Sequence, residues 1–451
     1  MTRMAWIVIG SVIAVGGLTP CTRGICPLPP VSSSASSSAS TFIPTLIPAV
    51  FAASQEQPGR PFEEVAKDLA SPDPKVRVNA MRTLNKAGHP DAIQYIARLL
   101  TDPKDDIQLE ALETLLGFYL PEVPAKSKRV AYVIEVEGGS RAARAFEQGP
   151  FILLPRPSPP ELKKGLAGAM RDDNPDIRLE ATYALGAMVP PPVGPEAEAS
   201  LAENLRDRDP AIRLAAARVA GAVRATTITD AIIAAINDSD EKIKLAALRA
   251  VGDIRDPRGV QALEEQFNFY KRGELARAAL DGLARIGQPS SLPLFQAHLT
   301  DRDPVIRRFA IEGVVHTHDK AAIDQLEIST AGESDNSTQL ARAYAMETAG
   351  KRGLDLLVSR LGDDLLHDQA MAYLVELGPR TIPALTEHLK DPNPRVRERI
   401  AQALGLIGDK TASPALEGTL RDPDVNVARA AERALARIRI ITESRQSQKA
   451  G

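Results

Sequence analysis

The chain has 451 residues, of which 44% are hydrophobic and 25% charged, a balance typical of a folded protein and unlike that of a disordered one. Its formal net charge is −3, and residues 1–53 hold two arginines and no acidic residue, so the remainder carries −5. This charge argues against a nucleic-acid-binding protein, which needs a basic surface. Cys21 and Cys26 are the only cysteines, which excludes disulfides, thiolate nucleophiles and cysteine-based metal sites from the rest of the sequence.

The first 53 residues have the composition of an export signal. Arg3 precedes an apolar run at residues 4–18, and a short cationic start followed by about 7–15 apolar residues is the build of a signal peptide. The run is short for a membrane-spanning helix. After a serine-rich spacer, residues 50–52 (VFA) resemble a cleavage site. We therefore expect a protein exported to the periplasm or cell envelope, with a mature chain that begins near Ala53.

Two other interpretations of this leader stay open. Residues 18–21 (LTPC) resemble a lipoprotein cleavage box, which would anchor the chain to the outer membrane through a lipid on Cys21. Proline directly before the cysteine departs from that pattern. A start codon assigned too far upstream would instead make the leader an extension without function.

From residue 62 to about residue 440 the sequence repeats one phrase of about 30 residues. The clearest copy is DPNPRVRERIAQALGLIGD at residues 391–409. A period near 30 corresponds to one helical hairpin, which cannot bury its apolar face without stacked neighbours. Aligned on the basic residue of "VR" or "IR", the clear copies have Arg77, Arg178, Arg213, Lys244, Arg307 and Arg397 at this anchor position. The weaker copies have Gln108, Ala276, Arg342, His367 and Ala428 there.

Each recurring position of the repeat has a predicted structural role. Aspartate or asparagine stands four residues before the anchor, where its side chain can cap the following helix, and proline often follows at the first helical position. Glycine recurs eight residues after the anchor, and this predicts a close helix crossing, because a mid-helix glycine otherwise costs about 1 kcal/mol relative to alanine. The capping residues are Asp73, Asn174, Asp209, Asp240, Asp303, Asn393 and Asp424, and the glycines are Gly186, Gly221, Gly252 and Gly405.

The consensus D-x-[DN]-P-x-[VI]-R-x-x-A-x-x-A-L-G-x-I-G resembles the HEAT-like repeat of the phycobilisome-lyase type. The resemblance implies an all-α fold, a right-handed α-solenoid (superhelix) of about 11 or 12 HEAT-like helical hairpins. It also implies that the anchor arginine and the aspartate six residues before it form a ladder between repeats. The copies that hold both residues supply the predicted ladder residues Asp172, Arg178, Asp207, Arg213, Asp301, Arg307, Asp391 and Arg397.

The repeat pattern breaks between Gln108 and Arg178, which are 70 residues apart. Within this gap, residues 121–160 hold six basic and four acidic side chains, and residues 129–137 (RVAYVIEVE) favour a strand or a degenerate repeat helix. Solenoid inserts often form the binding face, and interfaces favour tyrosine and arginine. We predict that the insert binds a partner, although a degenerate repeat with a long surface loop is the alternative. The predicted binding residues are Tyr119, Arg129, Tyr132, Arg141 and Arg144.

This pattern gives a predicted domain organisation for the whole chain. The parts are a leader at residues 1–53, N-terminal repeats at 54–117, an irregular insert at 118–160, further repeats at 161–440 and a disordered tail at 441–451.

The sequence lacks several common catalytic and metal-binding motifs. It has no GxSxG, no P-loop and no HExxH, and it lacks the His-Glu pairs through which related HEAT-like hydroxylases bind iron. His316 and His318 are two residues apart at the predicted end of a helix, a step that does not put them on one helix face. The D-x-[DN] segments lack the glycine and glutamate of a calcium loop. We expect no catalytic residue, no metal and no cofactor.

We therefore expect a non-catalytic scaffold that binds other proteins and is a monomer. Its partners should not include nucleic acid, and a membrane contact would arise only through a lipid on Cys21. The alternative function is a bilin-lyase-like or other protein-modifying factor. A nucleic-acid-binding HEAT solenoid is a third interpretation, which the net charge disfavours.

Overall fold

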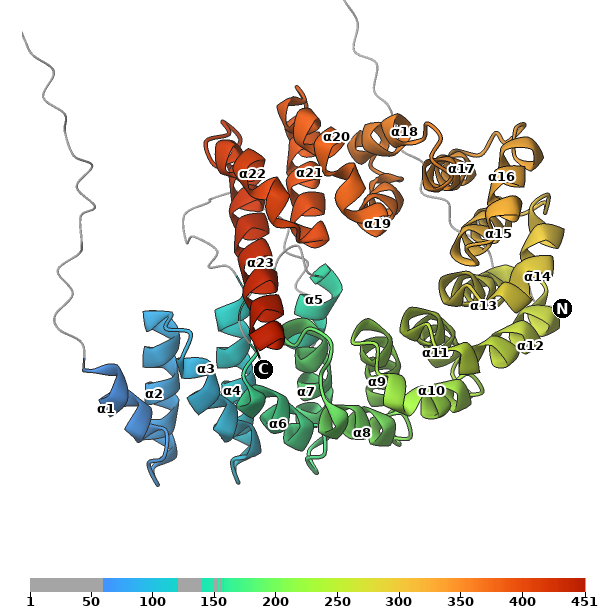
Figure 1. The fold of residues 1–451 in the computed structure, drawn as a ribbon. Helices are drawn as coiled ribbons and strands as arrows, with labels where there is room; N and C mark the ends of the chain where they lie inside the picture. The colour runs from blue at the N-terminus through green and yellow to red at the C-terminus, as the bar shows by residue number, and fades with distance from the viewer. Residues whose placement is uncertain (1–59, 121–139, 150–152, 155, 157, 451) are drawn as a thin grey trace, which may run out of the picture. The chain divides into compact units, whose positions relative to one another are not determined.

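Paired helices make up nearly all of the part of the chain that this computed structural model describes, namely residues 60–120, 140–149, 153–154, 156 and 158–450. Eleven pairs follow one another along these residues, and no strand occurs among them. The prediction of an all-α solenoid of about 11 or 12 hairpins is therefore confirmed (Figure 1). None of the described helices is long and apolar enough to cross a membrane.

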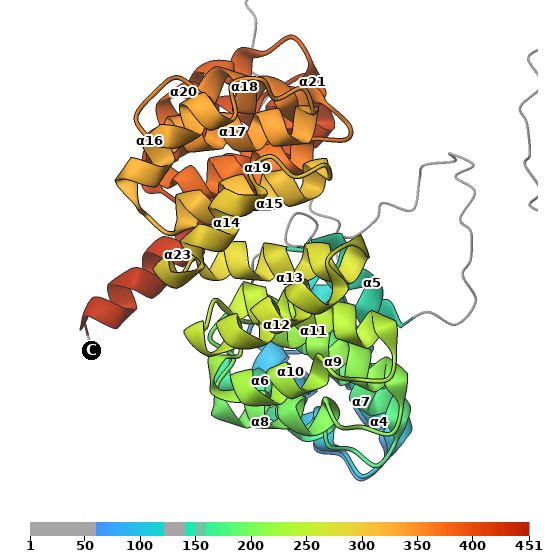
Figure 2. The ribbon, with the colours of Figure 1, turned by 90° about the vertical axis from the view of Figure 1, so that its right-hand side faces the viewer.

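The pairs stack so that their helices form an inner and an outer layer along one curved path (Figures 1 and 2). The second helix of each pair lies in the inner layer and contacts the inner helices of its neighbours. The inner helices are α2 (Pro74–Ala87), α4 (Asp105–Tyr119), α7 (Pro175–Met188), α9 (Pro210–Ala222), α11 (Glu241–Ile254), α13 (Gly273–Ile286), α15 (Pro304–His316), α17 (Asn336–Thr348), α19 (His367–Leu377), α21 (Pro394–Ile407) and α23 (Val425–Ala450).

The first helix of each pair lies in the outer layer and is often shorter. The outer helices are α1 (Phe62–Asp68), α3 (Ala92–Ile96), α6 (Pro160–Ala169), α8 (Pro195–Asn204), α10 (Thr229–Ala235), α12 (Val260–Tyr270), α14 (Leu292–His298), α16 (Lys320–Ser329), α18 (Leu354–Ser359), α20 (Ile382–Glu387) and α22 (Ser413–Thr419). Short 3₁₀ turns precede or extend several of them: η1 (Ala97–Thr101), η3 (Thr226–Ile228), η4 (Pro257–Gly259), η5 (Pro289–Ser291), η6 (Arg360–Gly362), η7 (Gly378–Thr381), η8 (His388–Lys390) and η9 (Lys410–Ala412).

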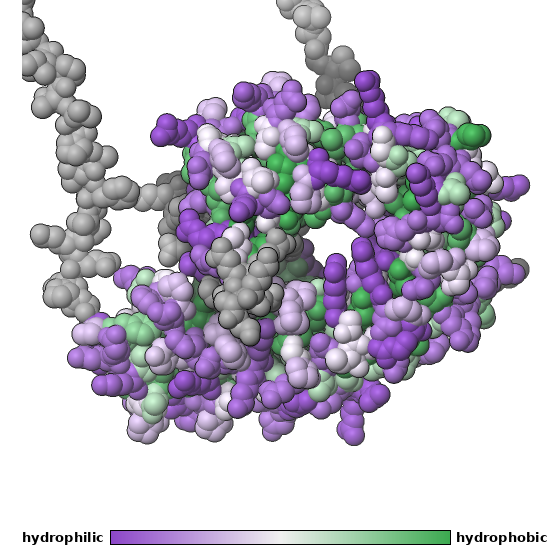
Figure 3. Space-filling model, in the orientation of Figure 1, coloured by the Kyte–Doolittle hydropathy of each residue, from purple (hydrophilic) through white to green (hydrophobic). Residues whose placement is uncertain are grey.

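The hydrophobic core runs between the two layers without interruption, from Val65 in α1 to Ile438 in α23. Its members are mostly leucine, isoleucine, valine and alanine, and Leu404, a predicted core residue, is fully buried. Hydrophilic residues cover most of the visible surface in Figure 3, and hydrophobic ones lie deeper between the helices. Each hairpin thus buries its apolar side against its neighbours, as repeat stacking requires.

Side-chain caps begin the inner helices where the sequence predicts them. At each of the seven predicted capping residues, a side-chain oxygen accepts a hydrogen bond of 2.8–3.0 Å from the backbone N–H two residues later. Proline occupies the first helical position of α2, α7, α9, α15 and α21. The cap satisfies an N–H that the helix leaves without a partner, and proline has no N–H to satisfy there.

Three of the four recurring glycines lie at close crossings between successive inner helices. A Cβ atom on Gly252 would lie 2.5 Å from the Cα of Gly282 in α13. One on Gly405 would lie 2.8 Å from the Cα of Ala434 in α23, and Gly221 has the same relation to α11. Because neither backbone can yield easily, the close crossing requires glycine. The predicted role is therefore confirmed for Gly221, Gly252 and Gly405. At Gly186 an added Cβ would instead meet the side chains of Phe146 and Val219, 2.7 and 3.0 Å away.

One weaker copy of the repeat lies in a different register from the predicted one. The cap of α17 is Asp335, which accepts from the N–H of Thr338, so the residue four positions after the cap is Gln339. Its Nε2 donates to the carbonyl oxygen of Glu333, six residues earlier, at 3.0 Å. The prediction of Arg342 as the anchor is therefore wrong. The sequence alignment required a basic residue, whereas the anchor of this copy is the uncharged Gln339.

The next copy departs from the usual anchor spacing. Asp363 accepts a 2.8 Å hydrogen bond from the N–H of Leu365, as the aspartates six residues before an anchor do in the other repeats. At the predicted anchor, His367, the ring Nδ1 lies 3.0 Å from the carbonyl oxygen of Asp363, which is only four residues earlier. Gln369, six residues after Asp363, donates instead to the carbonyl oxygen of Ser337 and to the hydroxyl of Tyr373.

The expected disordered tail at residues 441–451 is also wrong for residues 441–450, which continue α23. Ile438 is buried, and the side chain of Ile441 lies against Gly408, which follows α21. Apolar packing therefore carries the helix past the last repeat position. The predicted leader, residues 1–53, lies outside the described residues.

The crossing at Gly252 gives a direct test of the packing. Alanine in place of a mid-helix glycine normally stabilises a helix by about 1 kcal/mol. We expect Gly252→Ala to destabilise instead, by about 1–3 kcal/mol, because its Cβ would overlap α13. The matched control is Gly418→Ala in α22, where no atom lies within 4 Å of the added Cβ. Thermal unfolding and hydrogen exchange would report both, and a Gly252→Ala protein that melts above the wild type would contradict the crossing.

Candidate functional site

A ladder of hydrogen bonds joins successive repeats through the anchor arginines. In α21, Arg397 Nη1 donates to the carbonyl oxygen of Asp391 in its own repeat at 2.8 Å. Its Nε and Nη2 donate to both carboxylate oxygens of Asp422 in the next repeat, each at 2.7 Å. Arginine suits this place because its planar group makes two parallel bonds to a carboxylate. The ladder partner of each arginine is thus the acidic residue of the following repeat.

The structure brings some of the eight predicted ladder residues together and gives the others different partners. Arg178 Nε donates to Asp207 at 2.9 Å, which links two predicted residues. The other three arginines bond to Asp238, Glu333 and Asp422, which were not predicted. Asp301 and Asp391 instead hold their own repeat's arginine through their backbone carbonyl oxygens. The three missed acids stand six residues before Lys244, Gln339 and Ala428, so the spacing could have identified them where the anchor itself is not arginine.

The ladder also crosses the insert. Gln108 Nε2 in α4 donates to the carbonyl oxygen of Asp102 at 2.7 Å and to Asp172 Oδ2 at 2.8 Å. Asn174, the cap of α7, donates through Nδ2 to Asp105 Oδ2 at 2.7 Å. The repeats of Gln108 and Arg178, whose anchors are 70 residues apart in the sequence, therefore stack as direct neighbours.

The ladder acids are held in their charged form. The hydrogen bond from Arg307 lowers the pKa of the Glu333 carboxyl to about 2, and the bonds from Arg213 and Arg397 lower the pKa of Asp238 and of Asp422. Donation to a carboxylate stabilises its ionised form. These pairs are well covered, with 12% and 9% of the side chains exposed at Arg397 and Asp422. The ladder is thus a set of ionised, partly buried pairs.

The insert contributes one further helix, α5 (Arg141–Gln148), which packs on α7 of the inner layer (Figure 1). Phe146 in α5 lies against Tyr183, with 5.6 Å between ring centroids, and it covers Gly186. Arg218 in α9 lies over both rings, 5.5 and 5.9 Å from their centroids. Its Nη1 also donates to Glu147 at 3.1 Å.

The five predicted binding residues fall into different environments. Tyr119 ends α4 and is 2% exposed, and this burial raises the pKa of its hydroxyl, so it is a core residue and its proposed contact with a partner is wrong. Arg141 donates to Glu113 at 2.5 Å, and Arg144 is exposed. Arg129 and Tyr132, together with the strand expected at residues 129–137, lie outside the described residues.

A second group of polar side chains, which the sequence analysis missed, lies around His316 at the end of α15. Its Nδ1–H donates to the carbonyl oxygen of Ala284 in α13 at 2.7 Å. Its Nε2 is 2.9 Å from Glu376 Oε1 in α19 and 3.2 Å from the hydroxyl of Tyr344 in α17. One imidazole therefore contacts three other inner helices.

The charge of this imidazole follows from its neighbours. Burial alone would lower the pKa of His316, but the hydrogen bond and the charge of Glu376 outweigh it and raise the pKa above its usual value. Glu376 in turn has a lowered pKa, because His316 and Arg255 outweigh its burial. Arg255 Nη2, from the end of α11, lies 3.7 Å from the Glu376 carboxylate.

A buried pair lies beside this imidazole. The Tyr373 hydroxyl donates to the Glu312 carboxylate and accepts from Gln369 Nε2 at 2.8 Å. Arg308 Nε lies 3.6 Å from the same carboxylate. Tyr373 also stacks on Tyr344, with centroids 4.5 Å apart and planes at 9°. Burial raises the pKa of both Glu312 and Tyr373.

We call these residues of α15, α17 and α19 the inner polar cluster: Arg308, Glu312, His316, Tyr344, Gln369, Tyr373 and Glu376. Its polar groups bond to each other across repeats, which makes them structural ties within the inner layer. Among the described residues, no group of three or more His, Cys, Asp or Glu side chains could hold a metal ion. A sequence signal existed: the residue five positions after the anchor is polar or aromatic in many copies, including Tyr183, Arg218, Asp281, Glu312 and Tyr344.

The charge of His316 can be measured directly. We expect an NMR titration of its ring Cε1–H to give a pKa above 6.5, and Glu376→Gln to lower that pKa. Because the folded-state pKa is raised, the stabilisation from protonated His316 is complete below the unfolded pKa and is lost as pH rises through the folded pKa. The melting temperature should therefore fall with pH in this window in the wild type and fall less in Glu376→Gln.

His298→Gln is a useful control, because this histidine lies near Asp301 of its own repeat, away from the inner polar cluster. A wild-type His316 that titrates at or below 6.5 would contradict the inferred charge.

Comparison with known proteins agrees with this architecture. The family described as HEAT repeats matches residues 62–126, 198–268, 271–347 and 352–436. No curated protein matches the chain significantly. Many solved structures are similar at low identity, including the crystal structure of an engineered protein, with 17% identity over 84% of this chain and 98% of the other and a TM-score of 0.38.

Two further structures illustrate the range of similar proteins. The complex of CpcE and CpcF of phycocyanin lyase from Nostoc sp. PCC7120 is 19% identical over 53% of this chain and 95% of that chain, with a TM-score of 0.37. Human deoxyhypusine hydroxylase in complex with glycerol is 18% identical over 61% of this chain and 96% of that chain, with a TM-score of 0.26. Because the matched residues make up more than half of the sequence and follow the repeats described above, the chain belongs to the HEAT-repeat family.

Proposed function

We propose that this HEAT-repeat protein is a non-catalytic scaffold that binds another protein on its inner layer, next to α5. The observation that carries the proposal is the position of α5: the one long break in the repeat pattern places an added helix on α7 of the inner layer. Residues of a solenoid that depart from the repeat often form its binding face.

The side chains around α5 have the chemistry of a protein interface. We define the α5 patch as Arg144, Phe146 and Arg218, of which Arg144 is exposed and the other two are half-buried. Arginine and aromatic residues dominate the energetics of interfaces, because they bury a large area and still offer directed bonds. Arg218 is already held over Phe146, so little side-chain entropy remains to be lost on binding.

The bonding of the acid–base side chains supports a non-catalytic role. The strongest candidates for acid–base chemistry, Glu312, His316 and Glu376, are all engaged in bonds between inner helices. A scaffold needs these ties, whereas a catalytic group must be accessible to a substrate. We further propose that the protein acts as a monomer after export to the periplasm or cell envelope, on the basis of the leader sequence, with lipidation of Cys21 as the alternative form of attachment.

Affinity capture from an envelope extract with the chain from residue 53 onward, followed by mass spectrometry, tests the proposal. We expect specific protein partners, and we expect Tyr132→Ala combined with Arg144→Ala to weaken their binding at least tenfold with little change in melting temperature, since hot-spot residues each contribute more than about 1 kcal/mol. Arg206→Ala, an exposed residue that follows α8, is the matched control and should bind as the wild type does.

Two results would contradict the proposal. One is a double variant that melts several degrees lower and yet captures the same partners, which would make these residues structural. The other is a wild-type chain that captures nothing specific.

A further inference from the structure

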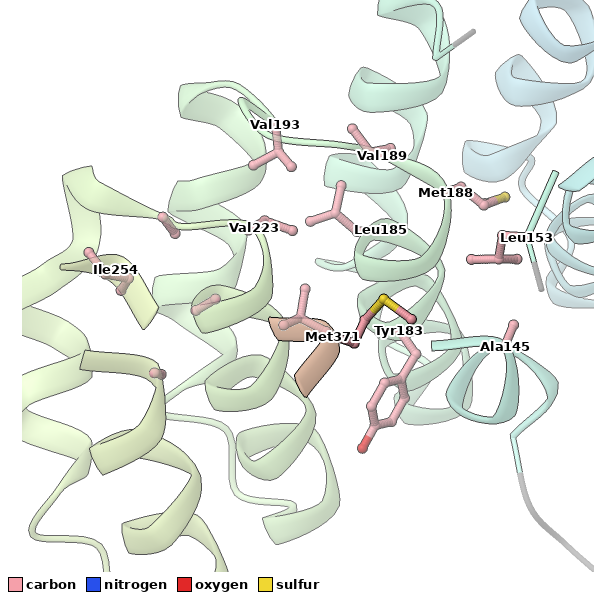
Figure 4. Close-up of a cluster of buried hydrophobic side chains, with 14 of the residues drawn as sticks. Ala145, Leu153, Tyr183, Leu185, Met188, Val189, Val193, Val223, Ile254 and Met371 are labelled. Carbon is pink, nitrogen blue, oxygen red and sulfur yellow. The ribbon is translucent and has the colours of Figure 1, made fainter. Parts of the chain in front are cut away.

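The curved inner layer brings together repeats that are far apart in the sequence (Figure 1). Arg255, which follows α11, lies 3.7 Å through Nη2 from Glu376 Oε1 in α19, although α13, α15 and α17 come between these helices in the stack. Met371, also in α19, is 5% exposed and belongs to the buried cluster drawn in Figure 4, together with Leu185 of α7 and Val223, which follows α9. In an open solenoid each repeat contacts only its neighbours. The late repeats of this chain therefore return towards the early ones.

Glu376 joins this long-range contact to the inner polar cluster. The carboxylate oxygen that faces Arg255, Oε1, also lies 2.9 Å from His316 Nε2 at the end of α15. The side chains of Arg255 and Glu376 are 44% and 33% exposed, whereas that of His316 is 13% exposed. An exposed ion pair alone holds two helices weakly. The bond from the more buried His316 is therefore the firmer tie between α19 and the repeats before it.

The geometry around the His316 imidazole requires a proton on both ring nitrogens. Nδ1 faces the carbonyl oxygen of Ala284 at 2.7 Å and Nε2 faces the Glu376 carboxylate at 2.9 Å, and both of these partners are acceptors. A neutral imidazole has only one N–H. If it keeps the bond to Ala284, its Nε2 becomes an acceptor, which repels the carboxylate and accepts instead from the Tyr344 hydroxyl, 3.2 Å away. Loss of one proton thus exchanges a partner in α19 for one in α17.

We propose that His316 and Glu376 form a pH-sensitive latch that holds the solenoid in its tight curve. While the imidazole is charged, it binds Glu376 and keeps α19 near α11. When the imidazole loses its proton, Glu376 loses its bond to α15, and the late repeats move away from the early ones. The closed form binds the proton more tightly than the open one, so rising pH favours opening.

Other charged groups around His316 come from the same inner helices. Arginine stays charged at any pH at which a protein folds, and burial raises the pKa of Tyr344 and of Tyr373 further above neutrality. Burial also raises the pKa of Glu312 and of Asp253, so these two acids are the alternative sources of a pH effect. The groups near the imidazole are Asp253 and Arg255 at α11, Asp281 and Arg285 in α13, Arg308 and Glu312 in α15, Tyr344 in α17, and Tyr373 and Glu376 in α19.

Distances between spin labels on α11 and after α19 test the latch. The full chain has only two cysteines, so Cys21→Ser and Cys26→Ser leave it free for labelling at chosen positions. Lys242→Cys near the start of α11 and Arg380→Cys after α19 introduce labels at exposed positions. Double electron–electron resonance should give a narrow distance distribution at about pH 5.5 and a longer, broader one at about pH 8.5, because histidine titrates in this interval.

Two substitutions should abolish the shift in distance. His316→Gln and Glu376→Gln each replace a member of the latch by a side chain that does not titrate. His298→Gln is the matched control and should retain the shift, because His298 lies near Asp301 of its own repeat. Glu376 is partly exposed, so its variant keeps the test valid if circular dichroism shows that His316→Gln fails to fold.

Three results would overturn the proposal. One is an identical distance distribution at both pH values in the otherwise wild-type chain. Another is a shift that persists in His316→Gln or Glu376→Gln, which would assign the pH effect to Glu312 or Asp253. The third is a shift that His298→Gln also abolishes.

Discussion

The stacking of many successive repeats depends on one interaction, in which the side chain of an anchor residue bonds at once to its own repeat and to the next. Arg397 shows it most fully, with a carbonyl of its own turn on one side and both oxygens of Asp422 on the other. Hydrophobic burial drives the hairpins together, but it is not directional. The ladder adds the direction, because a bidentate bond fixes both the distance and the angle between neighbouring inner helices. The close crossing of Gly405 with Ala434 lies between α21, which carries Arg397, and α23, which follows Asp422.

The ladder also explains how a 70-residue step between anchors can interrupt the repeats without breaking the stack. Gln108 keeps the two bonds of an anchor although it has no charge, so α4 and α7 stay neighbours and the residues between them are free to serve another purpose. Of the described residues between them, α6 continues the outer layer, whereas α5 packs on the inner layer, where Phe146 covers Gly186. The α5 patch lies here, which places the proposed partner-binding surface at the break in the pattern.

Local rules made most of the fold predictable. Asp or Asn four residues before an anchor indicates a helix cap, and glycine eight residues after it indicates a close crossing with the next repeat. Both residues recur at fixed positions of the repeat, so the sequence alone reveals them. Prediction from sequence failed for residues whose role depends on contacts with other repeats. Gln339 holds the anchor position without the expected charge, and Tyr119, which composition marks as an interface residue, is buried at the end of α4. His316 seemed isolated because its partners, Ala284, Tyr344 and Glu376, come from three other repeats.

The central claim is that the ladder continues across the insert, and a double-mutant cycle on Gln108→Ala and Asp172→Ala tests it most directly. The two residues are 64 positions apart in sequence and share one hydrogen bond of 2.8 Å. Residues in direct contact are coupled by about 0.5–3 kcal/mol, whereas distant ones add within about 0.3–0.5 kcal/mol. The ladder predicts that the second substitution costs clearly less free energy of unfolding once the first has been made. Strictly additive losses would mean that α4 and α7 are not joined in this way.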